Sequence, residues 1–231
     1  FPGCHINHLT PRTLDIDRVQ SMMPECGIEP KILIEGPPRR EVPILLRQTS
    51  FKALEEPVLF AGEMRGTHTA RFGEIEQRGV ALTPKGRALY DELLNKAGTG
   101  KDNLTHQLHL QEVFKAFPDS EFLLRQQGLA WFRYRLTPSG EAHRQAIRPD
   151  DDPQPLIERG WLVAQPITYE DFLPVSAAGI FQSNLGNETQ ARSHGNSSRD
   201  AFEQALGCAV YDEFALYQEA QDRSKRRCGL L

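Results

Sequence analysis

Long hydrophobic runs, clustered cysteines and a strong charge of either sign are all missing from this chain of 231 residues. No apolar run approaches the roughly 20 residues that a membrane span needs, which argues against a membrane anchor. The four cysteines are too few and too scattered for a disulfide scaffold, and none lies in a CxxC pair, so a reducing cytoplasm is the expected compartment. The formal charge of −4 argues against a general nucleic-acid binder.

Several well-known catalytic motifs are missing as well. No GxSxG, GxxxxGK[ST], HExxH or GxGxxG pattern occurs, so no residues support a serine hydrolase, an NTPase or a dinucleotide-binding protein. The composition, with 39% hydrophobic and 25% charged residues, is that of a globular protein. The polar stretch TGKDN is the expected boundary between two regions, 1–98 and 99–231.

Hydrophobic spacing in the first hundred residues predicts the order strand, helix, strand, strand, strand. A short strand in CHINHLT precedes a helix in DIDRVQSMM, whose aspartate is typical of a helix start. Three further strands are expected at 31–36, 42–51 and 69–82, the last of them after a polar loop at 61–67.

Helices dominate the expectation for the rest of the chain. The stretch 82–98 predicts a helix with Thr83 as N-cap, Pro84 in the first turn and Gly98 at the end. A second helix is expected at 104–117, and two more lie near the C-terminus, after strand-like pieces broken by prolines. The sequence therefore predicts an α+β protein, with a βαβββ unit and a mixed sheet followed by a helix-rich C-terminal extension.

Histidines and glutamates on the predicted strands are the candidate metal ligands. His8 shares a strand face with Ile6, and His5 points the other way. In the strand at 69–82, Glu74 and Glu76 lie on one face. A buried, unpaired carboxylate costs several kcal/mol, so such a face needs a cation, a metal or water. The pattern favours an ion pair with a neighbouring arginine, Arg71 or Arg78, or an exposed face over a metal site.

Two other features permit a binding site without demanding one. His106 and His109 have the i, i+3 spacing of a helical metal site, but no acidic ligand lies at a matching spacing. The small residues from Ser176 to Gly179 let backbone N–H groups approach a ligand closely. On the residues alone, a tight turn against the core is the favoured interpretation of this second stretch.

Four long strings carry a resemblance to a known family: INHLTPRTLDID, EGPPRREVPILLRQTSFKALEE, GTHTARFGEIEQRGVALTPKGR and PVSAAGIFQSNLG. They resemble the bacterial 2-oxoadipate dioxygenase/decarboxylase family, also called hydroxyglutarate synthase, and look most like its enterobacterial members. The likeness runs from residue 1 to residue 231. That family resembles the vicinal oxygen chelate superfamily, in which each βαβββ unit offers metal ligands from its first and last strands.

The resemblance implies an Fe(II) enzyme of lysine degradation that converts 2-oxoadipate and O₂ into D-2-hydroxyglutarate and CO₂. Two histidines and one glutamate hold the family's iron, and the second histidine maps onto His8. The glutamate maps onto Glu76, with Glu74 as the alternative on the same face. The family also holds its substrate through backbone amides that map onto Val175 and Ser176, which favours a carboxylate-binding nest there.

One departure from the family limits what the chain is expected to do alone. The family's first histidine ligand and a substrate-binding arginine lie in an N-terminal module that precedes the position of Phe1, so we expect this chain to be the C-terminal part of a longer protein. Two other functions stay open at this point. His and Glu also suit a zinc-dependent lyase or isomerase of the same fold, and the chain is also compatible with a non-catalytic ligand-binding module.

Overall fold

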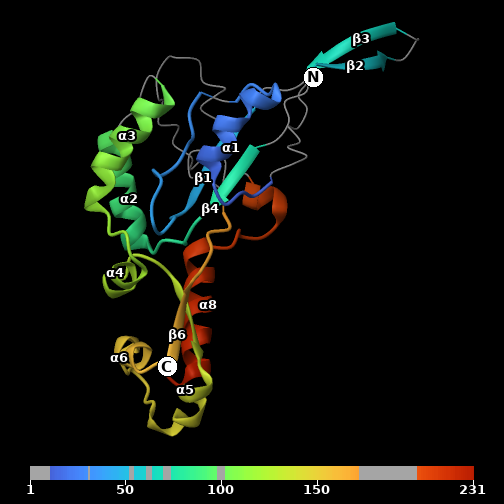
Figure 1. Cartoon of the computed structure of the whole chain (residues 1–231). Coiled ribbons are helices and arrows are strands. Elements are labelled where there is room, and N and C mark those ends of the chain that lie inside the picture. The colour runs from blue at the N-terminus through green and yellow to red at the C-terminus, as the bar shows by residue number, and fades with distance from the viewer. Residues whose placement is uncertain are drawn as a thin grey trace. The chain divides into compact units, whose positions relative to one another are not determined.

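The chain forms two compact units in a computed structural model. The structure describes residues 11–30, 32–51, 55–60, 64–69, 74–97, 102–171 and 202–231. The first unit comprises residues 1–79 and 88–120, and the second comprises residues 80–87 and 121–231. Figure 1 shows the helices and strands of both units.

Helices and short antiparallel sheets make up both units, which agrees with the α+β class predicted from the sequence. The elements before residue 100 are α1 (Ile16–Met22), η1 (Pro24–Cys26), β1 (Leu46–Ser50), β2 (Glu55–Phe60), β3 (Met64–Thr69), β4 (Glu74–Arg78) and α2 (Pro84–Ala97). The later elements are α3 (Asn103–Val113), η2 (Phe114–Ala116), α4 (Glu121–Gln126), β5 (Phe132–Leu136), α5 (Pro138–Ala142), η3 (Arg144–Ala146), α6 (Pro153–Glu158), β6 (Leu162–Pro166) and α8 (Glu213–Cys228).

The expected boundary at residue 98 does not coincide with the division into units, because helix α3 belongs to the first unit. The backbone N–H of Ile34 donates to Asn103 Oδ1 at 3.0 Å, and this bond ties the start of α3 to the earlier part of the chain. Residues 80–87 belong to the second unit, where the N–H of Thr83 donates to the carbonyl of Leu129.

Four predicted helices are confirmed, two of them with the expected caps, and one of those expected near the C-terminus is present as α8. Asp15 caps α1 by accepting from the N–H of Arg18 at 3.0 Å. Thr83 caps α2, since its hydroxyl accepts from the N–H of Gly86 at 3.1 Å. The helix expected at 104–117 is present as α3 followed by the 3-10 turn η2. The sequence predicted these two caps because a capping bond depends only on residues within one turn of the helix.

The central sheet of the first unit is built on β1 and β4, which pair antiparallel (Figure 1). Two single-residue bridges extend the pairing on either side. Arg12 pairs with Glu76 of β4 in parallel, and Glu35 pairs with Gln48 of β1 in antiparallel orientation. Helix α1 packs against both β1 and β4. The order along the chain is therefore extended segment, helix, extended segment, strand, strand, with the β2–β3 hairpin inserted before the last strand.

The segment expected to form a strand at 31–36 contributes to this sheet through one isolated bridge, from Glu35 to Gln48. Gly36 follows with φ of 102°, and a Cβ there would lie 2.2 Å from the carbonyl oxygen of Leu46. The prediction of a full strand was wrong, because the chain turns at this left-handed glycine immediately after the bridge.

The strand expected at 69–82 is also divided differently. Of the described strands, only Thr69, the last residue of β3, and the whole of β4 fall within this stretch, and β4 ends just before Gly79. A Cβ on Gly79 would lie 2.2 Å from the carbonyl carbon of Pro43, so the chain passes there directly against another backbone segment. The β2–β3 hairpin occupies part of the expected loop at 61–67. Proline and glycine inside its two strands weaken the sequence signal for strands.

In the second unit, β5 pairs antiparallel with β6, and helix α8 packs against β5. Two side chains of α8 accept hydrogen bonds from the backbone of β5. Gln221 Oε1 accepts from the N–H of Phe132 at 3.0 Å, and Ser224 Oγ accepts from the N–H of Tyr134 at 2.9 Å. The helix thereby covers an edge that would otherwise be open to another strand.

Within the described ranges, no helix is both long and apolar enough to cross a membrane.

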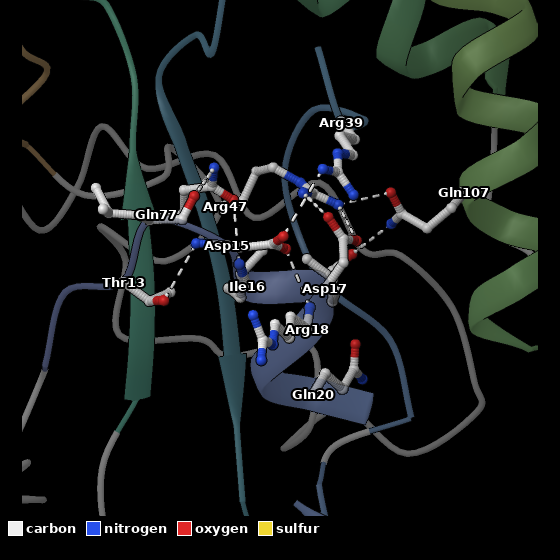
Figure 2. A network of polar contacts seen from close by, with 12 residues as sticks. Thr13, Asp15, Ile16, Asp17, Arg18, Gln20, Arg39, Arg47, Gln77 and Gln107 are labelled. Carbon is white, nitrogen blue, oxygen red and sulfur yellow. Dashed lines mark hydrogen bonds and ion pairs between the residues drawn. The ribbon is translucent and has the colours of Figure 1, made fainter. Parts of the chain in front are cut away.

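A buried arginine connects α1, β1 and α3 in the first unit (Figure 2). The two terminal nitrogens of Arg47 on β1 donate to the carboxylate oxygens of Asp17 on α1, at 2.7 and 2.9 Å. Arg47 Nη2 also donates to Gln107 Oε1 of α3 at 2.9 Å, and only 3% of the arginine side chain is exposed. Partial burial alone would raise the pKa of Asp17, but the hydrogen bonds and charge of Arg47 outweigh it and hold the pKa below its usual range.

Replacing Asp17 by Asn is expected to lower the free energy of unfolding by about 2 kcal/mol at neutral pH, because Arg47 keeps its burial and loses its counter-charge. The folded-state pKa of Asp17 is depressed, so the wild-type advantage is present above the unfolded pKa and is lost as the pH falls through the folded pKa. Denaturant titrations at neutral pH and below about pH 4 measure both effects.

Glu92→Gln is the matched control, since it breaks an exposed ion pair with Lys96. We expect a change within about 0.5 kcal/mol for this variant. Equal effects of the two substitutions would contradict a structural role for the Asp17–Arg47 pair.

Candidate metal centre

The backbone of Glu76 is held on both sides by neighbouring chain segments. Its N–H donates to the carbonyl of Pro11 at 3.0 Å, and its carbonyl accepts from the N–H of Thr13 at 2.8 Å. On the other side Glu76 lies opposite Gln48 in the β1–β4 ladder. The residue therefore occupies an interior position of the sheet, with its Cα fixed by pairing in both directions.

The two faces of this sheet have different environments. Helix α1 lies against the face that carries Arg47 and Gln77, since Arg47 binds Asp17 of α1 and Gln77 Oε1 accepts from the N–H of Ile16 (Figure 2). Because side chains alternate along a strand, Glu76 and Arg78 point to the opposite face. The candidate ligand thus lies on the face away from α1.

The carboxylate of Glu76 is buried and ion-paired. Arg78 Nε and Nη2 both donate to Glu76 Oε2, at 2.9 and 2.8 Å. Only 3% of the Glu76 side chain and 9% of the Arg78 side chain are exposed. Of the alternatives left open by the sequence, an exposed face is wrong for Glu76, and the ion pair with Arg78 is present. The side chain of Glu74 lies outside the described part of the structure.

A row of polar residues crosses this face of the sheet. Paired residues of neighbouring strands point to the same side, so Gln48 and Glu35 share the face of Glu76. Gln48 Nε2 donates to Glu35 Oε2 at 3.2 Å, and Gln48 is buried. Sequence reasoning missed both residues. Alternation within LRQTS places Gln48 on one face, but only the pairing register shows that this is the face of Glu76.

The other residues predicted for the site lie outside the described ranges: His8, Val175 and Ser176. His5 lies outside them as well. His106 and His109 are described and lie on α3. His106 is mostly buried, and burial together with the neighbouring His109 lowers its pKa. Among the described residues, no group of three or more His, Cys, Asp or Glu side chains is placed to hold a metal ion. Of the expected ligands, the structure therefore places Glu76 alone.

Comparison with known proteins assigns this chain to a family. The family described as "2-oxoadipate dioxygenase/decarboxylase" matches residues 1–184. A relative of that name from Escherichia coli is 89% identical over 231 residues, which cover 100% of this chain and 52% of the relative. The chain belongs to the 2-oxoadipate dioxygenase/decarboxylase family. A relative from Pseudomonas putida is 53% identical, so the expected likeness to enterobacterial members is confirmed.

A solved structure agrees with the family assignment. The crystal structure of the hydroxyglutarate synthase from Pseudomonas putida in complex with 2-oxoadipate matches with a TM-score of 0.77 and 49% identity, over 95% of this chain and 49% of that chain. The chain thus spans about half the length of the curated relatives and solved structures that it matches.

The pairing of Glu76 with Arg78 generates a test that separates a metal ligand from a simple ion pair. If Glu76 is the ligand, Glu76→Gln in a family-length protein that carries this chain should weaken Fe(II) binding by more than about 100-fold, since loss of an outer partner of a ligand alone costs 10- to 100-fold. Glu74→Gln should weaken it by less than about 10-fold. Anaerobic titration followed by metal analysis gives both values. The reverse ranking would assign the ligand to Glu74, and two normal affinities would leave Glu76 as an ion-pair partner only.

Proposed function

We propose that this chain is part of an Fe(II)-dependent 2-oxoadipate dioxygenase/decarboxylase that forms D-2-hydroxyglutarate and CO₂ in lysine degradation. The observation that carries the proposal is the buried Glu76 carboxylate at an interior position of the sheet, in a chain that belongs to this family. A relative named hydroxyglutarate synthase binds 2-oxoadipate in its crystal structure. The match to that relative covers 95% of this chain.

The sheet pairing supports a βαβββ unit of the vicinal-oxygen-chelate type. Glu76 pairs with the segment at Pro11 to Thr13, which follows His8 by three residues. Three extended residues span at most about 11 Å, so the covalent chain alone keeps His8 within that distance of Pro11. The first and last extended segments of the unit are therefore neighbours, as a site that takes one ligand from each requires.

The residue types present fit an iron site. Proteins hold non-haem Fe(II) with two histidines and one carboxylate, which leaves open positions for a bidentate substrate and O₂. In this proposal His8 and Glu76 supply two of the three ligands, and the other histidine comes from the N-terminal half of the family's length. When bound, iron supplies the redox chemistry that lets O₂ react with a 2-oxo acid.

The net reaction balances without a further reductant. The C1 carboxyl group of 2-oxoadipate leaves as CO₂, C2 becomes the new carboxylate, and the carbon next to it gains a hydroxyl group. One oxygen atom of O₂ enters the new carboxylate and the other enters the hydroxyl group. The electrons released by decarboxylation and by oxidation of the C–H bond reduce O₂ completely.

The chain's own contribution to this reaction is to bind and orient. Glu76 is fixed through its backbone on both sides and through its carboxylate, so it presents a charge at a constant position. Backbone amides at Val175 and Ser176 are proposed to hold a substrate carboxylate, because successive N–H groups form a nest for anions. Fixing both ends of a dicarboxylate places its reacting carbons next to the metal.

His8 provides the direct test of the proposed iron site. In a family-length protein, His8→Ala should abolish both stoichiometric iron binding and conversion of 2-oxoadipate, and the thermal melt should remain cooperative. Anaerobic metal analysis and product detection measure these outcomes. Retention of one iron per chain in the variant would overturn the ligand assignment, and zinc in place of iron in an anaerobically purified, active wild-type protein would overturn the choice of metal.

Substrate binding through backbone amides predicts a contrast between neighbouring positions. Ser176→Ala keeps its N–H and should change the affinity for 2-oxoadipate little. Val175→Pro deletes one donor, and loss of a hydrogen bond to a charged group should weaken binding by about 10- to 150-fold. Calorimetric titration measures both, and circular dichroism melts together with unchanged iron content serve as controls. Equal losses in the two variants would make the serine hydroxyl the contact.

A further inference from the structure

Glu76 lies in a sheet that fixes its backbone and leaves its side-chain torsions to be fixed by something else. Pro11 and Thr13 hold its peptide groups on one side, and β1 holds the strand on the other. A glutamate side chain still has three rotatable bonds after its Cα is fixed. A metal ligand must be oriented within a narrow range of angles, so a site that uses Glu76 needs a second contact on the carboxylate.

Arg78 makes that contact. It lies two residues further along β4, on the same face, and its Nε and Nη2 donate to one and the same carboxylate oxygen, Oε2. Two charge-assisted hydrogen bonds from a planar guanidinium fix the position of Oε2 and thereby restrict the side-chain torsions of Glu76. Both side chains are almost fully buried, which strengthens the contact because little water competes for it.

We infer that Arg78 is a positioning residue for the metal. It holds Glu76 Oε2, so that the carboxylate binds the ion through Oε1 alone. This inference rests on the proposed function, in which Glu76 is the ligand. Arg78 also supplies the cation that a buried carboxylate needs before any metal is present. A guanidinium that only competed with the metal would repel the divalent cation. Its substitution would then raise the affinity for Fe(II), whereas loss of a positioning residue lowers it.

The test measures the affinity of the apo protein for Fe(II), in a family-length protein that carries this chain, under anaerobic conditions. Positioning by Arg78 predicts that Arg78→Gln weakens Fe(II) binding by about 10- to 100-fold, as is usual for outer partners of metal ligands. Arg78→Lys should recover part of this loss, because a lysine supplies the positive charge but not the pair of hydrogen bonds to Oε2 from one planar group. Tighter binding in Arg78→Gln would show that Arg78 competes with the metal, which would overturn the inference.

Arg40→Gln is the matched control. Arg40 is also a buried arginine of the first unit, with 4% of its side chain exposed, and it donates to the carbonyls of Phe117 and Pro118 and pairs with Asp119. None of these partners lies on β4. We expect Arg40→Gln to lower the melting temperature and leave the Fe(II) affinity unchanged. An equal loss of affinity in both arginine variants would mean that general destabilisation explains the effect of Arg78, and would overturn the inference.

A spectroscopic readout separates orientation from charge. The infrared difference spectrum between apo and Fe(II)-loaded protein should show a carboxylate bound through one oxygen in the wild type and a different binding mode in Arg78→Gln. The same mode in both would overturn the positioning role.

Glu76→Gln separates the proposed ligand role of Glu76 from the inferred role of Arg78. If Glu76→Gln abolishes Fe(II) binding and Arg78→Gln has no effect, only the inference about Arg78 fails. If Glu76→Gln also has no effect, the proposed ligand set fails with it.

Discussion

The burial of one carboxylate, that of Glu76, is the constraint on which the candidate site depends. A charge that is withdrawn from water must be compensated nearby, and the structure supplies Arg78 two residues away on the same strand face. The backbone pairing of Glu76 with the segment at Pro11 to Thr13 keeps this pair inside the sheet. The same pairing places the segment at Pro11 to Thr13 directly beside β4.

The β1–β4 ladder carries a second buried arginine on its other face, and the two pairs have different consequences. Arg47 binds Asp17 and Gln107, and thereby joins α1 and α3 to β1 (Figure 2). Arg78 binds Glu76 within its own strand and joins no other element through that contact. Strand alternation thus separates a face that holds the unit together from a face that carries the candidate ligand and the polar residues beside it.

Family membership explains why a site with one described candidate ligand is still informative. The chain covers 52% of its Escherichia coli relative and 49% of the solved hydroxyglutarate synthase chain. A facial iron site assembled from both halves of such a length would leave each half with too few ligands to bind metal firmly by itself. We therefore expect metal affinity to depend on the presence of both halves.

The sequence by itself determined what depends on neighbouring residues. The caps at Asp15 and Thr83 were predicted correctly, because a capping bond joins residues three positions apart. The strings that carry the family resemblance also limited the proposed carboxylate ligand to Glu74 or Glu76. Only the tertiary structure decided which face of β4 lies away from α1, that Glu76 is buried with Arg78, and that Gln48 lies beside it. These features depend on the register between segments far apart in the sequence, such as those of Ile16 and Gln77, which are 61 positions apart. Local spacing does not encode register, because shifting a strand by one residue leaves its pattern intact and reverses every side chain.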